Sequence, residues 1–132
     1  MLAQRLGSRL CPDCKKPATP SDKVQTIIKS ETDSLPAGLK ATIKGKAPFS
    51  VYRTGNNPEC KTCKGKGTAG RVAIFEIFKM TRELEKIIGQ GFTEGALIDE
   101  TKRQGMVTLR QDGILKALAG EVMLEEVLRE TE

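Results

Sequence analysis

Four cysteines in two C-x-x-C pairs are the residues of this chain best suited to chemistry. The pairs are Cys11-Pro-Asp-Cys14 and Cys60-Lys-Thr-Cys63, and the chain contains no histidine. Two residues between the cysteines of a pair let both sulfurs face one ion, so the two pairs can supply a tetrahedral shell of thiolates. Four protein sulfurs leave no open coordination position, which predicts a structural rather than a catalytic Zn²⁺ site. Iron is the alternative metal that the residues leave open.

The glycine-rich segment after the second pair invites other interpretations. Residues 65–70, GKGTAG, match the G-x-G-x-x-G fingerprint of dinucleotide-binding loops. That fingerprint follows a strand and opens a helix, whereas this segment follows a cysteine pair and precedes a predicted strand. We therefore expect these glycines to supply positive φ angles beside a metal loop. A redox C-x-x-C would need a nearby β-α-β pattern, which we do not find, and four reduced, buried cysteines that bind nothing are the other alternative.

The distribution of charge favours a thiolate site. Residues 1–70 contain 13 basic and 5 acidic residues, a net charge of +8, whereas residues 71–132 have a net charge of −3. Cations near the cysteines lower thiol pKa values and stabilise the deprotonated ligands. The gap of 45 residues between Cys14 and Cys60 is long for a zinc ribbon, but the entropy of loop closure grows only logarithmically with length. The lysines nearest the cysteines in sequence are Lys15, Lys16, Lys61, Lys64 and Lys66.

The basic half also allows a second interpretation, a nucleic-acid-binding zinc module. Only Phe49 and Tyr52 are aromatic in that half, so few side chains could stack on bases. We therefore expect nucleic acid not to be the partner. The motif C-x-x-C-x-G-x-G at 60–67 also resembles one repeat of the DnaJ chaperone cysteine-rich region, but that region uses several such repeats and this chain has one.

No catalytic constellation is visible in the sequence. It has no G-x-x-x-x-G-K-[ST] phosphate loop, and the lack of histidine excludes Ser-His-Asp and Cys-His arrangements. We expect no catalytic residue and no ATP turnover by this chain alone. No run of about 18 apolar residues and no signal peptide occur, which predicts a cytoplasmic location without membrane insertion. Of the 132 residues, 38% are hydrophobic and 4% aromatic, a lean core that a metal ion would help to stabilise.

The elements predicted to position the cysteines are short. Residues 2–10 place leucines at steps of four, which predicts a helix, and residues 23–32 predict another. Residues 71–78, RVAIFEIF, predict a strand buried on both faces apart from Glu76. After residue 81 we expect three or four short amphipathic helices with glycine stops. The predicted fold is therefore small α+β, mainly short helices with a few short strands around a tetracysteine zinc site.

The order of these segments resembles the C-terminal end of the ATPases of type II secretion and type IV pilus assembly. The resemblance covers nearly the whole chain and is weakest in residues 21–58. It rests on LAQRL before the first pair, C-x-x-C-x-G-x-G, GRVAIFEIF and a closing segment. The most specific residues of that segment are Gly105, Met106, Thr108, Leu109, Arg110, Asp112, Gly113, Lys116, Gly120 and the run Glu125-Glu-Val-Leu-Arg129.

This resemblance implies a detached part of a hexameric cytoplasmic motor that hydrolyses ATP with Mg²⁺ to drive pilin or pseudopilin assembly. Residues 1–10 would be the last helix of an upstream RecA-like domain, 11–70 a tetracysteine zinc element and 71–132 a strand plus a small helical subdomain. Cys11, Cys14, Cys60 and Cys63 match the zinc ligands of the family.

The same resemblance implies partners and one further site residue. The partners would be the RecA-like domain, neighbouring motor subunits and an inner-membrane platform or recruitment protein, which places the motor at the inner membrane. Arg71 is a candidate nucleotide contact in the intact motor, because a guanidinium can stack on a base. A surface ion pair is the alternative role for this arginine.

Overall fold

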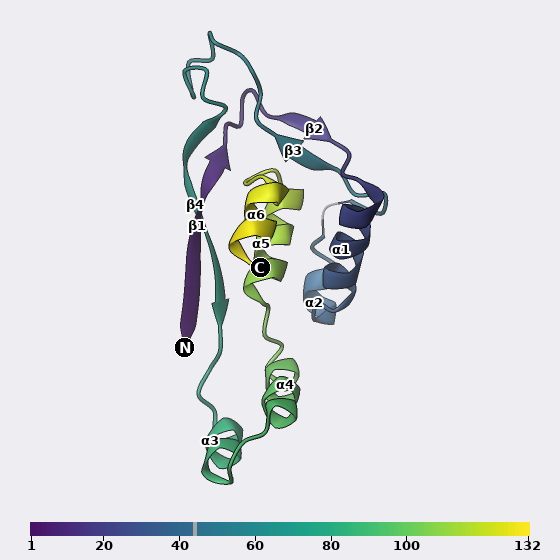
Figure 1. Cartoon of the computed structure of the whole chain (residues 1–132), viewed down its shortest axis with the longest axis vertical. Coiled ribbons are helices and arrows are strands. Elements are labelled where there is room, and N and C mark those ends of the chain that lie inside the picture. Colours follow the sequence, from purple (N-terminus) through teal and green to yellow (C-terminus); the bar gives the residue numbers. More distant parts are fainter. Residues whose placement is uncertain (44) are drawn as a thin grey trace.

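A long two-stranded antiparallel sheet runs along one side of the molecule (Figure 1). The computed structural model describes residues 1–43 and 45–132. Strand β1 (Leu2–Leu10) pairs with β4 (Thr68–Ile77), and an irregularity in the register falls between Ser8 and Leu10. One end of this sheet leads into the cysteine loops, and the other leads into a pair of helices.

Residues 2–10 form strand β1, so the predicted helix is wrong. Leucines at steps of four lie on one face of a helix, but they also lie on one face of a strand, where side chains alternate. The spacing alone therefore cannot decide between the two. The strand forms because β4, far away in sequence, supplies a hydrogen-bonding partner along most of its length, and Gly7 lowers the competing helix propensity.

Strand β4 confirms the predicted strand at 71–78, but only one of its faces is buried. Val72 and Ile74 are 5% and 2% exposed, whereas Phe75 and Ile77 are 41% and 52% exposed. The helices pack on one face of the two-stranded sheet, so alternate residues of the apolar run remain on the other face. A continuous apolar run could not reveal that only one covering layer exists.

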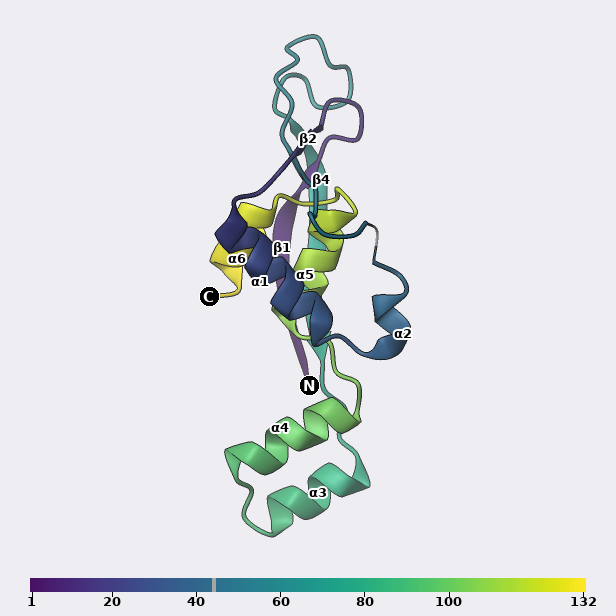
Figure 2. The same ribbon diagram turned by 90° about the vertical axis from the view of Figure 1, so that its right-hand side faces the viewer.

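Three helices complete the main core. Figure 2 shows α1 (Asp22–Asp33) lying across α5 (Leu109–Leu118), with the long sheet behind them, and α6 (Leu124–Glu130) packs beside α5. Helix α5 begins with a capping box formed by Thr108 and Gln111. The core is formed by Ile28, Phe49, Val51, Val72, Ile114, Ala117, Leu118, Val122, Leu124 and Val127.

A second, smaller sheet joins the cysteine loops to this core. Its strands are β2 (Lys16–Ala18) and β3 (Val51–Arg53), which pair antiparallel. A four-residue helix, α2 (Ala37–Lys40), lies in the segment that connects α1 to β3. With short helices and two small sheets, the fold is the predicted α+β class.

Helices α3 (Arg82–Gly89) and α4 (Glu94–Arg103) form a hairpin at the end opposite the cysteines (Figures 1 and 2). The hairpin is tied by Glu100, which is 3% exposed and accepts hydrogen bonds from Thr81, Arg103 and Gln104. The hydrogen bonds from Arg103 and Gln104 lower the pKa of Glu100 to about 2, although burial opposes this. No helix in the described ranges is long and apolar enough to cross a bilayer.

Candidate metal centre

The two sheets bring the cysteine pairs together. The first pair connects β1 to β2, and the second lies between β3 and β4. Because β1 pairs with β4 and β2 pairs with β3, the two chain segments run antiparallel on both sides of the cysteines. The pairs therefore meet where one sheet ends and the other begins, although 45 residues separate them in sequence.

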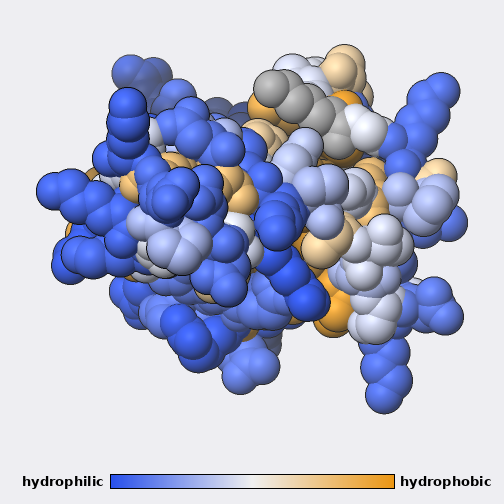
Figure 3. All heavy atoms as spheres, turned by 90° about the horizontal axis from the view of Figure 1, so that it is seen from above, coloured by the Kyte–Doolittle hydropathy of each residue, from blue (hydrophilic) through white to orange (hydrophobic). Residues whose placement is uncertain are grey.

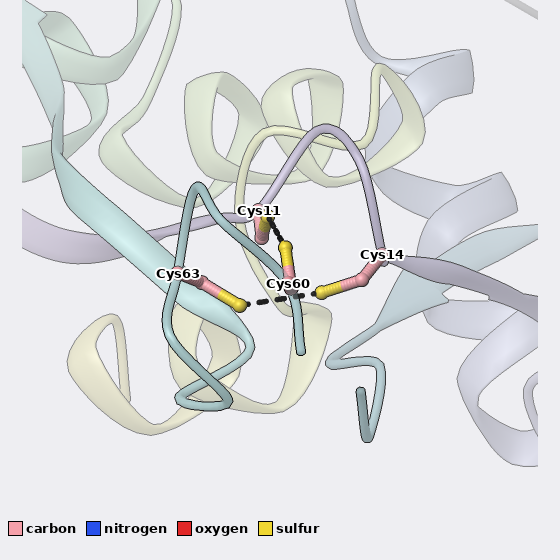
Figure 4. Close-up of side chains that lie close together, drawn as sticks. All are labelled: Cys11, Cys14, Cys60 and Cys63. Atoms are coloured by element: carbon pink, nitrogen blue, oxygen red, sulfur yellow. Dashed lines mark hydrogen bonds between the residues drawn. The ribbon is translucent and has the colours of Figure 1, made fainter. Parts of the chain in front are cut away.

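The structure places all four sulfurs in one cluster (Figure 4). The four Sγ atoms lie within 4.8 Å of one another. The Sγ atoms of Cys11 and Cys60 are 3.7 Å apart, and those of Cys14 and Cys63 are 3.5 Å apart. Three of the cysteines are buried and Cys14 is half-buried. The cluster thus closes between the two pairs, as the spacing within each pair predicts.

This geometry fits a four-coordinate metal ion. Zinc–sulfur bonds of about 2.3 Å in a tetrahedron place the sulfurs about 3.8 Å from one another. The observed separations of 3.5 and 3.7 Å lie close to that value. Four soft sulfur donors select zinc or iron rather than magnesium or calcium. The donor set and its spacing therefore suit a closed metal site, with no coordination position left for a substrate.

Both cysteine turns close in the same way. The backbone N–H of Lys15 donates to the carbonyl of Cys11 at 3.1 Å, and that of Lys64 donates to the carbonyl of Cys60 at 2.8 Å. Lys64 has a φ of 52°. Gly65, Gly67 and Gly70 all have positive φ, which confirms the conformation expected for the glycines beside the second pair.

Two contacts between the pairs were not anticipated from the sequence. The hydroxyl of Thr62 donates a short hydrogen bond to the carboxylate of Asp13, so a residue within one pair binds a residue within the other. Gly55 lies against the first pair so closely that a Cβ atom there would overlap the carbonyl oxygen of Cys14. Neither position matches a recognised motif, and only the tertiary structure identifies them.

The Sγ atoms of Cys14 and Cys63 lie within hydrogen-bonding distance, and this contact shifts the pKa values of both thiols. The hydrogen bond to Cys63 raises the pKa of the Cys14 thiol to about 12. Burial acts to raise the pKa of Cys63, but hydrogen bonds from the backbone of Gly67 and from Cys14 outweigh it and lower that pKa to about 7. Thiolates are the metal-binding form of cysteine, so metal binding at this cluster releases protons.

The lysines near the cysteines have different surroundings. Lys16, Lys61, Lys64 and Lys66 are exposed. Figure 3 views the molecule from the end that carries the cysteine loops, and hydrophilic side chains cover most of the surface visible there. Lys15 is half-buried and lies 4.8 Å from the centroid of the Tyr52 ring.

The remaining candidate residues lie outside the cluster. Arg71 is exposed on β4, opposite Ser8 of β1. Phe49 is 8% exposed in the main core, and Lys15 lies over Tyr52. Both aromatic residues considered for base stacking are thus engaged within the protein, which disfavours the nucleic-acid interpretation.

Comparison with known proteins identifies the family of the chain. A profile of the family described as "Type II/IV secretion system protein" matches residues 1–129. The chain belongs to this family. It is 36% identical to the type IV pilus assembly ATPase PilB of Myxococcus xanthus over 131 residues, which are 99% of the chain and 21% of the relative. It is 32% identical to the type II secretion system ATPase E of Vibrio cholerae, again over 131 residues, 99% of the chain and 23% of that relative.

The secretion-family relatives are much longer than this chain. A third example, PilB of Thermus thermophilus, is 33% identical over 131 residues, which are 99% of the chain but only 13% of the relative. The chain therefore spans between 13% and 23% of the length of these three relatives.

Proposed function

We propose that this chain is the zinc-stabilised C-terminal structural and interaction region of an ATPase motor for type II secretion or type IV pilus assembly. The single observation that carries the proposal is the closed cluster of four cysteine sulfurs within 4.8 Å, in a chain that matches the secretion family over residues 1–129. In this proposal Cys11, Cys14, Cys60 and Cys63 are the ligands of one Zn²⁺ ion.

The proposed role of the ion is to hold two chain segments together. Residues 11–70 form the zinc-binding element and residues 71–132 the strand and helical subdomain. The four thiolates fill the coordination shell, so the ion acts on folding and not on a substrate. By itself the chain binds zinc, does not hydrolyse ATP and does not require nucleic acid.

The other proposals concern the longer protein. There, an upstream RecA-like domain would bind ATP and Mg²⁺, and six copies would form the motor. This region would contact that domain, the neighbouring subunit and an inner-membrane platform or recruitment protein, at the cytoplasmic face of the inner membrane. Arg71, which is exposed on β4, would approach the nucleotide in that assembly.

Metal analysis of the purified chain tests the zinc proposal. We expect about one zinc per chain, released by denaturation or by thiol modification, and no ATP turnover that follows the protein through purification. A metal-free, fully folded protein with four titratable thiols would refute the metal centre. Salt-sensitive binding to mixed DNA or RNA would instead favour the nucleic-acid module.

The gene's upstream reading frame tests the parentage separately. We expect it to encode a G-x-x-x-x-G-K-[ST] loop between a strand and a helix, continuous with this chain. An upstream frame without such a loop would contradict the motor proposal and leave the metal centre intact.

A further inference from the structure

Lys15 connects the first cysteine pair to the helical core. It follows Cys14 directly, and its backbone N–H closes the turn of the pair on the carbonyl of Cys11. Its side-chain Nζ donates to the carbonyl of Gly120 at 2.9 Å. The same Nζ lies over the Tyr52 ring. Lys15 therefore contacts the turn of the first cysteine pair, the small β2–β3 sheet and the carboxyl end of α5.

Gly120 leaves space for the Lys15 side chain because it has no Cβ atom. Its φ is +77°, and a Cβ atom there would lie 2.5 Å from Nζ of Lys15 and 2.9 Å from Cδ2 of Tyr52. The residue follows α5, where carbonyl groups lack helical partners and the helix dipole favours a cation. A buried glycine at this position therefore leaves room for an ammonium group at the carboxyl end of α5.

The turn between α5 and α6 is also held from the other flank of the first pair. The backbone N–H of Leu10, which precedes Cys11, donates to the carbonyl of Glu121 at 2.9 Å. Leu10 is 2% exposed. The residues on either side of the Cys11–Cys14 turn thus bind two consecutive carbonyls of one turn in the core.

We propose that Lys15 is a positioning residue of the metal centre: by binding the carbonyl of Gly120 it holds the first cysteine pair in its ion-binding arrangement and couples ion occupancy to the order of the α5–α6 turn. The inference rests on the proposed zinc function. It differs from a general electrostatic effect, because any exposed lysine near the thiolates could lower their pKa values, whereas only a bound side chain can fix the position of the turn.

Lys64 provides the matched control. It follows Cys63 as Lys15 follows Cys14, and its backbone N–H closes the second turn in the same way, but its side chain is exposed. Lys15→Met and Lys64→Met each remove one positive charge next to a ligand. We expect Zn²⁺ affinity, measured by competition with a chromogenic chelator, to fall about tenfold in Lys15→Met and no more than about twofold in Lys64→Met.

Backbone hydrogen exchange gives a readout that charge alone would not change. The N–H groups of Gly120 and Glu121 donate to Ala117 and Lys116. We expect Zn²⁺ to slow exchange of these two amides in the unmodified chain and in Lys64→Met, but much less in Lys15→Met. Lys15→Arg should restore both properties, because a guanidinium can donate to the carbonyl and stack on the ring.

Equal affinity and equal exchange in the two methionine variants would overturn the inference. Failure of the unmodified chain to bind Zn²⁺ would instead refute the proposed metal centre, so the two failures are distinguishable. Should Lys15→Met not fold even with Zn²⁺, Tyr52→Leu replaces it, since this change removes the aromatic face under Nζ. A Tyr52→Leu variant with unchanged affinity and unchanged exchange would then count against Lys15.

Discussion

Removal of the metal ion should unfold the cysteine loops and leave the main core folded. The buried cluster at the site consists of Cys11, Cys60 and Cys63, with Cys14 and Ala69 packed against it. The main core is a separate cluster of ten buried residues. The loop of residues 54–67 contains no helix or strand, so in the proposed metal centre it would be ordered by the ion, this small cluster and a few hydrogen bonds such as that from Thr62 to Asp13.

Order-of-magnitude free energies support unfolding of residues 54–67 alone. Ordering about fourteen backbone residues at roughly 1 kcal/mol each costs about 14 kcal/mol. Burial of the small cysteine cluster contributes on the order of 5 kcal/mol, which is too little. A structural zinc ion adds on the order of 10 kcal/mol, and the two contributions together then match the cost. Without the ion, the ordered form of this loop is disfavoured by roughly 9 kcal/mol.

Hydrogen exchange with mass spectrometry measures this prediction. After chelation we expect loss of protection in residues 54–67, while peptides covering α5 and α6 remain protected except at their connecting turn. Cys60→Ser in the presence of Zn²⁺ should reproduce this pattern, and chelator should then change little. Retained protection of residues 54–67 without metal, or loss of protection throughout the chain, would refute the reasoning.

Three further predictions follow from individual contacts. Gly55→Ala should weaken Zn²⁺ binding about tenfold or more, because a Cβ atom there overlaps the Cys14 carbonyl oxygen. Chelator competition measures the Zn²⁺ affinity. The control Gly38→Ala, where a Cβ atom would have nothing within 4 Å, should leave the affinity unchanged. Gly113→Ala should lower the free energy of unfolding in urea by about 1–2 kcal/mol, because overpacking against Val127 outweighs the gain in helix propensity. If the changes in unfolding free energy of Gly113→Ala and Val127→Ala simply add in the double variant, this contact is contradicted. The pKa of Glu100 is lowered from 4.5 to about 2, so its ionised carboxylate stabilises the fold above pH 4.5 and this contribution is lost as the pH falls toward 2. Between these pH values, acid should therefore destabilise Glu100→Gln less than the unmodified chain. Parallel profiles of unfolding free energy against pH for the two proteins would exclude this role.

Local signals in the sequence predicted many individual elements. The helix at 23–32 and the amphipathic helices with glycine stops after residue 81 were expected from the sequence, and α1 and α3–α6 confirm them. The Thr108 and Gln111 capping box needs only four consecutive residues, so its sequence signature suffices. The cysteine spacing likewise indicated that two distant pairs converge.

Pairing between strands that are distant in sequence decided the secondary structure where apolar periodicity fitted both a helix and a strand. Leu2, Leu6 and Leu10 fit one face of either a helix or a strand, and only the presence of β4 beside them selects the strand. For β4 itself, composition indicated a strand, but the exposure of Phe75 and Ile77 depends on which faces the helices cover.

The sequence by itself therefore indicated the four cysteines that cluster, the capping box of α5 and the family, because each depends on residue types at short spacings. Only the tertiary structure decided that two antiparallel pairings bring the cysteines together and that Lys15 extends to Gly120. The sulfur contacts between the pairs join residues 49 positions apart, and Lys15 and Gly120 are 105 positions apart. Their geometry depends on how the sheets and helices pack, which no local pattern of residues encodes.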